Sequence, residues 1–170
     1  MRLPTLLLLS ICVWLTGLAK AADGSGINRE FQLKTAYLFH FAELAQWPSS
    51  TPITICLQGA SPISAYLPAL EGQQIDGKSI HVDLTGRPNL EQCSILFLSE
   101  LAALDSVLST QARTLHILLV SDVEDFAYRG GMVQFTLRDN RLKLVVNLAV
   151  VRSADLKLSS KLLRMAEIIE

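Results

Sequence analysis

The sequence lacks most of the motifs that mark a catalytic protein. It contains neither a GxGxxG nor a P-loop pattern, which excludes the common ways in which a glycine-rich loop holds a nucleotide phosphate. The turn Gly59-Ala60-Ser61-Pro62 comes nearest to a nucleophile elbow, but Ile63 stands where that motif needs glycine. We therefore expect no serine hydrolase and no catalytic residues.

Cysteine and histidine are also scarce. The three cysteines, Cys12, Cys56 and Cys93, include no CxxC pair, which argues against a dithiol oxidoreductase. The three histidines lie in three separate segments, and none has a second ligand at metal-binding spacing. We expect neither a cofactor nor a metal site.

Dense positive charge is missing as well. The most basic stretch, residues 138–143, is interrupted by Asp139 and Asn140 and is typical of a solvent-exposed hairpin tip. A protein that binds nucleic acid normally presents a basic face that displaces counterions from the phosphates. Nucleic acid is therefore not an expected partner.

The first 21 residues predict a signal peptide. Arg2 precedes an apolar run over residues 6–15, and small residues follow at positions 19–21. The run is shorter than the roughly 20 residues that span a bilayer, which favours cleavage before Ala22 over a retained anchor. Cleavage removes Cys12 and two basic residues, leaving 13 basic and 16 acidic residues and a formal charge of −3.

After this leader, the sequence suits one domain over residues 28–170, preceded by a small-residue lead over residues 22–27 that we expect to be loose. Asn28 is a candidate N-cap for a long helix over residues 29–46, which Pro48 ends. The apolar and aromatic residues of this helix cover more than one face. Such a helix either packs inside the core or covers a partner.

Short apolar runs then alternate with helical segments. The predicted strands cover residues 53–57, 79–84, 95–98 and 115–120, and the predicted helices cover residues 63–70 and 100–111. Continuous apolar strands belong to sheets that are covered on both faces. The sequence therefore predicts an α/β fold, a layered and mostly parallel sheet flanked by helices.

The last third of the chain departs from this alternation. Residues 132–138 and 141–147 flank the turn Asp139-Asn140 and predict a β-hairpin at the edge of the sheet. A final helix should follow, capped by Ser159 or Ser160. The predicted fold thus ends in a C-terminal β-hairpin and helix.

Two cysteines and two loops are the candidate site residues. Cys56, near the end of one strand, and Cys93, just before another, predict a disulfide, because paired cysteines in an exported protein are usually joined. Two free thiols are the alternative, since parallel strands in simple register can hold such positions too far apart to bond. The loop residues follow two strands, at the edge where open α/β sheets bind ligands. They are Gly59, Ser61, Ser121 and Asp122.

From Lys34 onward, the sequence resembles the YfiR family of periplasmic proteins. The resemblance lies in an aromatic helix that closes on Trp47-Pro48 and in two strand motifs that contain Cys56 and Cys93. The remaining motifs follow in the family's order: Ser121-Asp122 with Phe126, Gly130-Gly131-Met132, Asn147-Leu148-Ala149 and residues 158–163. Some relatives carry a second cysteine pair near the hairpin, which this chain lacks.

The resemblance implies a regulator, a periplasmic homodimer that binds the periplasmic sensor domain of an inner-membrane diguanylate cyclase and so limits cyclic-di-GMP and biofilm formation. Repression of this kind needs only a higher affinity for the inactive state of the membrane protein. A histidine kinase is an alternative partner, and a small-molecule receptor is the alternative function. The aromatic helix and the final helix supply the candidate contact surface, Tyr37, Phe41 and Leu163.

Overall fold

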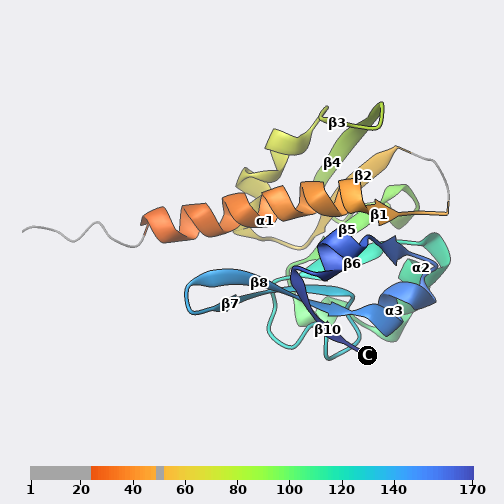
Figure 1. The fold of residues 1–170 in the computed structure, drawn as a ribbon. Helices are drawn as coiled ribbons and strands as arrows, with labels where there is room; N and C mark the ends of the chain where they lie inside the picture. The colour runs from red at the N-terminus through yellow and green to blue at the C-terminus, as the bar shows by residue number, and fades with distance from the viewer. Residues whose placement is uncertain (1–23, 49–51) are drawn as a thin grey trace, which may run out of the picture.

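Residues 24–48 and 52–170 are described by a computed structural model (Figure 1). The expected signal peptide at residues 1–21 lies outside the described residues. The α-helices are α1 (Gly24–Leu44), α2 (Ser106–Leu115), α3 (Leu148–Ser153) and α4 (Ser160–Leu163). Four short 3-10 helices are η1 (Pro62–Ala65), η2 (Leu67–Leu70), η3 (Leu90–Gln92) and η4 (Leu101–Ala103). The strands are β1 (Ala45–Gln46), β2 (Ile53–Gln58), β3 (Gln74–Ile75), β4 (Lys78–Gly86), β5 (Ile95–Leu98), β6 (Leu118–Ser121), β7 (Val133–Arg138), β8 (Arg141–Asn147), β9 (Lys157–Leu158) and β10 (Ala166–Ile169).

Eight of the described strands form one sheet in the order β10-β8-β7-β6-β5-β2-β4-β3. The five central strands, from β4 to β7, run parallel. Strand β3 is antiparallel to β4, and β8 is antiparallel to β7 but parallel to β10. The remaining two strands, β1 and β9, pair with each other. The predicted mostly parallel α/β sheet is therefore confirmed.

Helices cover both faces of this sheet. Helix α1 crosses one face, where it contacts η1, η2, β8 and α4 (Figure 1). Helix α2 connects β5 to β6 and contacts η3. The segment with η1 and η2 connects β2 to β4 in the opposite direction along the sheet, so right-handed crossovers place α2 on the face opposite η1, η2 and α1. None of the helices within residues 24–48 and 52–170 has the length and hydropathy to cross a bilayer.

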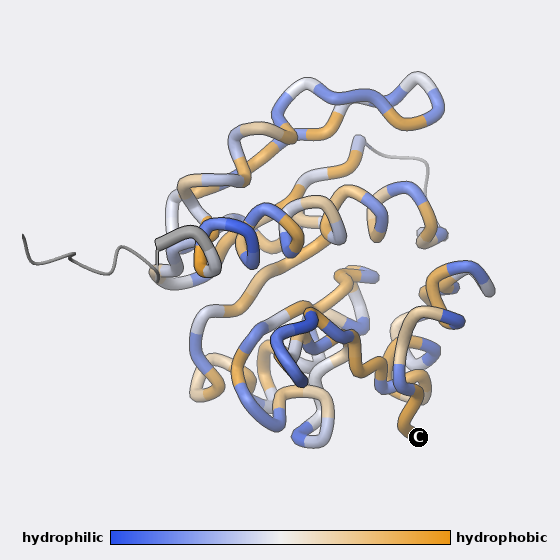
Figure 2. Tube along the Cα trace, turned by 60° about the vertical axis from the view of Figure 1, so that its left-hand side comes forward, coloured by the Kyte–Doolittle hydropathy of each residue, from blue (hydrophilic) through white to orange (hydrophobic). Residues whose placement is uncertain are grey.

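The aromatic helix packs into the core. Phe41 is completely buried, and its ring lies 5.8 Å from that of Phe135 on β7. Strands β5 and β6 are buried along their whole length, as expected for all-apolar strands between two helical layers. Figure 2 shows α1, which follows the grey N-terminal trace, alternating between hydrophilic and hydrophobic residues, consistent with one buried and one solvent-facing side.

This helix also begins earlier than the sequence predicts. It starts at Gly24, so residues 24–27 of the expected loose lead are helical and Asn28 lies inside the helix instead of capping it. The Asn28 Oδ1 atom accepts a hydrogen bond from the Tyr66 hydroxyl (2.8 Å). Asn28 therefore does not cap the helix. Its side chain instead binds Tyr66, which lies between η1 and η2 and is 38 positions away in the chain.

Two predicted helices in the middle of the chain are wrong in extent. Residues 63–70 form η1 and η2 instead of one α-helix, because Pro68 has no backbone N–H and disfavours an uninterrupted helix at this point. The helix expected over residues 100–111 is divided into η4 and α2. Asp105 makes the break: its side chain accepts a hydrogen bond from the Leu108 N–H (2.7 Å) and caps α2.

The C-terminal end differs most from the prediction. The hairpin β7–β8 forms as expected, but it does not lie at the sheet edge, because β10 pairs in parallel with β8. Ser159 does cap a helix, yet α4 lasts only one turn and residues 166–169 form the edge strand. The apolar pattern of residues 162–169 is too short to distinguish a helix from a strand.

Candidate functional site

The four predicted loop residues lie at the carboxyl-terminal ends of β2 and β6, and each has a structural task there. The Gly59 N–H donates to the Gly86 carbonyl (3.0 Å), and Gly59 has a φ of +85°. Ser61 caps η1. The Ser121 hydroxyl donates to the Leu98 carbonyl (2.7 Å) and accepts from the Val123 N–H (3.1 Å).

Asp122 belongs to a partly buried ion cluster. Its carboxylate lies 2.6 Å from the Nζ atom of Lys34, a buried residue of α1 that also pairs with Glu30 one turn away. The same ammonium lies 4.7 Å from the centre of the Phe31 ring. Lys34 thus ties α1 to the end of β6, and its charge is satisfied within the protein.

The two mature cysteines form a disulfide. Cys56 is completely buried in β2, and its Cα lies 5.8 Å from that of Cys93. The register of β2 and β5 pairs Cys56 with Leu96, but Cys93 lies before β5 as the C-cap of η3, and the path of the chain there brings it to Cys56. The bond therefore links the centre of the sheet to the segment that enters β5.

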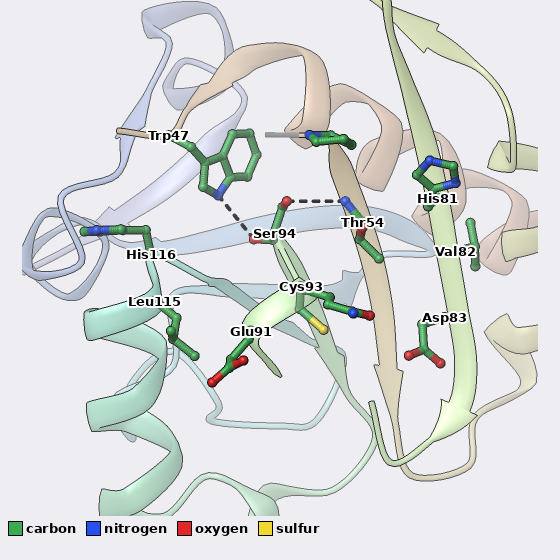
Figure 3. A pocket seen from close by; sticks show the side chains of 12 residues that line it. Trp47, Thr54, His81, Val82, Asp83, Glu91, Cys93, Ser94, Leu115 and His116 are labelled. Carbon is green, nitrogen blue, oxygen red and sulfur yellow. Dashed lines mark hydrogen bonds between the residues drawn. The ribbon is translucent and has the colours of Figure 1, made fainter. Parts of the chain in front are cut away.

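A cavity of about 540 Å³ lies beside this disulfide, at the amino-terminal ends of β2, β5 and β6. Trp47 forms one wall, and its indole N–H donates to the Ser94 carbonyl (3.3 Å). Figure 3 shows Glu91 and Asp83 on either side of Cys93, with Trp47 farther along the cavity. The sequence does not predict this cavity, because its walls come from five separate segments of the chain. Trp47-Pro48 indicates only the end of a helix.

The three predicted contact residues lie close to the core. Phe41 is completely buried, so it is not part of the surface of the chain, and this part of the prediction is wrong. Tyr37 and Leu163 are half-buried and pack against the core. The Tyr37 ring lies 6.0 Å from that of Phe135.

The more exposed apolar residues of α1 lie elsewhere, in a groove between α1 and the tip of the β7–β8 hairpin. Ile27, Leu33 and Leu137 are exposed, and with Tyr37 they line this groove of about 780 Å³. Its lining also includes four charged residues, Arg29, Glu30, Asp139 and Arg141. We call this surface the helix–hairpin groove.

Comparison with known families places the chain. Residues 31–167 match the YfiR/HmsC-like family. The chain belongs to this family. The resemblance carried by the aromatic helix, the two cysteine motifs and the hairpin is thereby confirmed. YfiR-like proteins are periplasmic and regulatory, and they are not a family of enzymes.

No curated protein matches the sequence. Among solved structures, the chain is similar to the ABC domain in complex with L-Trp from Streptococcus pneumonia, with a TM-score of 0.52 and 9% identity. The alignment covers 82% of this chain and 60% of the other, so the chain spans less than two thirds of that relative's length. At this identity the likeness shows the fold alone.

Proposed function

We propose that this protein is a periplasmic regulator that binds and represses an inner-membrane diguanylate cyclase through the periplasmic sensor domain of the enzyme. Membership of the YfiR/HmsC-like family over residues 31–167 carries the proposal. The repressor is exported by the leader at residues 1–21, acts as a homodimer, and lowers cyclic-di-GMP and biofilm formation. A membrane histidine kinase is the alternative partner.

The geometry of the loops supports a binding protein. The polar groups at the carboxyl-terminal edge of the sheet bond to one another or to the backbone, as Lys34 with Asp122 and Ser121 with Leu98 illustrate. Repression requires a surface with a higher affinity for one state of the partner, and such a surface needs no reactive group.

The helix–hairpin groove is the surface that we propose for the sensor domain. Its exposed apolar residues, Ile27, Leu33 and Leu137, are bordered by charges of both signs. Protein interfaces commonly have this arrangement, with an apolar centre that loses its water and a polar rim. Membership of a periplasmic regulatory family supports a regulatory partner, which we take to be a signalling protein anchored in the inner membrane.

Deletion and complementation test this function. Loss of the gene should raise cellular cyclic-di-GMP, and the wild-type gene should restore it. Leu33→Asp, which places a charge in the groove, should fail to restore it and should lose capture of the cyclase from membranes of the same cell. Val107→Asp is the matched control, because Val107 is an exposed apolar residue on the other helical layer, and it should behave as wild type.

The two variants also separate partner binding from self-association. Light scattering should give the same dimer mass for Leu33→Asp and Val107→Asp. A monomeric Leu33→Asp protein would assign the groove to the homodimer instead. Unchanged cyclic-di-GMP in the deletion strain, together with capture of a histidine kinase, would replace the cyclase by the kinase as partner.

A further inference from the structure

The cavity beside the disulfide is built from several rigid elements. Thr54 of β2, Val82 of β4, Ser94 at the start of β5 and Leu115 at the end of α2 contribute to its lining. Its volume of about 540 Å³ lies within the roughly 300–1,000 Å³ typical of small-molecule sites. A small ligand is therefore of the right size to occupy it.

The charge of the lining selects the sign of the ligand. Asp83 and Glu91 supply two carboxylates, and none of the described residues that line the cavity is a lysine or an arginine. Asp83 accepts a hydrogen bond from the Thr85 N–H (2.9 Å), which fixes its carboxylate without neutralising it. Of the two histidines in the lining, His81 already bonds to Glu71, outside the cavity. An anion would meet repulsion here, and a cation would be attracted.

An aromatic side chain lies farther along the cavity from the carboxylates (Figure 3). The Trp47 indole is half-buried and donates a hydrogen bond to the Ser94 carbonyl, so one of its ring edges is held in place; Pro52 and Leu115 add apolar surface elsewhere in the lining. An indole favours both apolar groups and nearby cations. Next to it, the ring of His116 is held by a bond between Nδ1 and the Ala154 carbonyl (2.8 Å), although His116 has a φ of +58°, a backbone conformation uncommon outside glycine. Each ring is thus held by a hydrogen bond within the protein.

From this arrangement we propose that the cavity is a binding site for a small organic amine. The ammonium group lies between Asp83 and Glu91, near Cys93, and the apolar part of the ligand extends toward Trp47 (Figure 3). Cys93 forms part of the lining, so the site also lies against the disulfide. The proposal does not depend on the membrane partner, because the site belongs to one chain.

An NMR titration of the purified mature protein tests the site directly. The probe is 2-phenylethylamine, which joins an ammonium to an aromatic ring, and 3-phenylpropionate is the probe with reversed charge. The amine should cause saturable shifts at the amides of Thr54, Val82 and Ser94, and phenylpropionate should not. Shifts that fail to saturate, or equal binding of both probes, would overturn the proposal.

Paired variants separate the two carboxylates from general charge effects. Asp83→Asn with Glu91→Gln should weaken binding of the amine about tenfold or more, since charge-assisted contacts are lost while the shape is kept. Glu100→Gln with Glu124→Gln removes the same net charge from exposed residues outside the cavity and should leave the affinity unchanged. Equal affinities in the two double variants would show that Asp83 and Glu91 do not form the site.

Discussion

The two edges of the central sheet differ in how their polar groups are used. At the carboxyl-terminal edge, Ser121 bonds across to β5 and Asp122 pairs with the buried Lys34. Toward the amino-terminal edge lies a cavity that Asp83 and Glu91 help to line, and it contains no lysine or arginine among its described lining residues. The polar groups at the carboxyl-terminal edge are thus paired within the protein, whereas the carboxylates of Asp83 and Glu91 have no lysine or arginine beside them in the described lining and can pair with a ligand.

This difference shows that a general rule for open α/β sheets can be reversed by local contacts. Ligands usually bind at the carboxyl ends of the strands, where the strand order reverses. Here the strand order reverses between β2 and β5, since the chain leaves β2 toward β4 and leaves β5 toward β6. At the carboxyl ends of these two strands, Gly59 and Ser99 lie so close together that little space remains for a ligand between them. The cavity instead opens at the other end of the same strands, where Trp47 and η3 form its walls.

The largest expected effect concerns the disulfide beside the cavity. Cys56→Ser with Cys93→Ser should lower the free energy of unfolding by up to about 4 kcal/mol, because the bond closes a long loop in the unfolded chain, with a sequence separation of 37. Urea unfolding of the oxidised protein and of the double variant measures this loss.

Reductant supplies the control for this prediction. It should destabilise the wild-type protein to the level of the double variant and leave the double variant unchanged. If oxidised and reduced wild type unfold at the same urea concentration, the disulfide does not stabilise the protein. The region around the cavity would then owe its shape to packing alone.

The second prediction concerns the ion cluster at the carboxyl-terminal edge. Lys34→Met should cost about 3 kcal/mol, because it leaves the carboxylates of Glu30 and Asp122 close together without their cation. Both carboxylates are partly exposed, which keeps the cost at the low end for a broken buried pair. Lys143→Met, at an exposed position on β8, is the control and should change stability little. Equal urea midpoints for the two variants would mean that the cluster does not hold α1 to the sheet.

The fold was easier to predict than the site, for a physical reason. Strand β5 is a short run of apolar residues buried on both faces, so its composition alone identified it. The strand predicted over residues 115–120 begins only at Leu118, because Leu115 ends α2 and His116 caps it. Residues 63–70 and 166–169 were wrongly predicted as helices, since Pro68 and the pairing with β8 decided their conformations.

The site depends on pairs that no local pattern contains. Lys34 and Asp122 are 88 positions apart, and their contact determines whether a loop at the carboxyl-terminal edge is free to bind. Cys56 and Cys93 could be paired by composition and compartment, but not placed beside a cavity. The positions of Asp83 and Glu91 relative to Trp47 follow from the sheet order, which the sequence did not predict.

The smallest expected effect tests the close approach of β2 and β5 at the carboxyl-terminal edge. A Cβ at Gly59 would lie 2.1 Å from the Ser99 Oγ, and Gly59 has a positive φ, so Gly59→Ala should cost about 2 kcal/mol. Gly72→Ala is the matched control, because Gly72 also has a positive φ (+74°) and also donates to a carbonyl of β4, but no atom lies within 4 Å of its added Cβ.

The control variant should therefore show the backbone cost alone, about 1 kcal/mol. Ser99→Ala combined with Gly59→Ala should recover most of the difference, because it removes the clashing hydroxyl and leaves the Ser99 Cβ at an ordinary distance of 3.4 Å. Thermal or urea unfolding of the three variants measures both steps. Equal losses for Gly59→Ala and Gly72→Ala would show that this edge has room to spare, and the contrast between a filled and an open edge would then rest on the ion cluster alone.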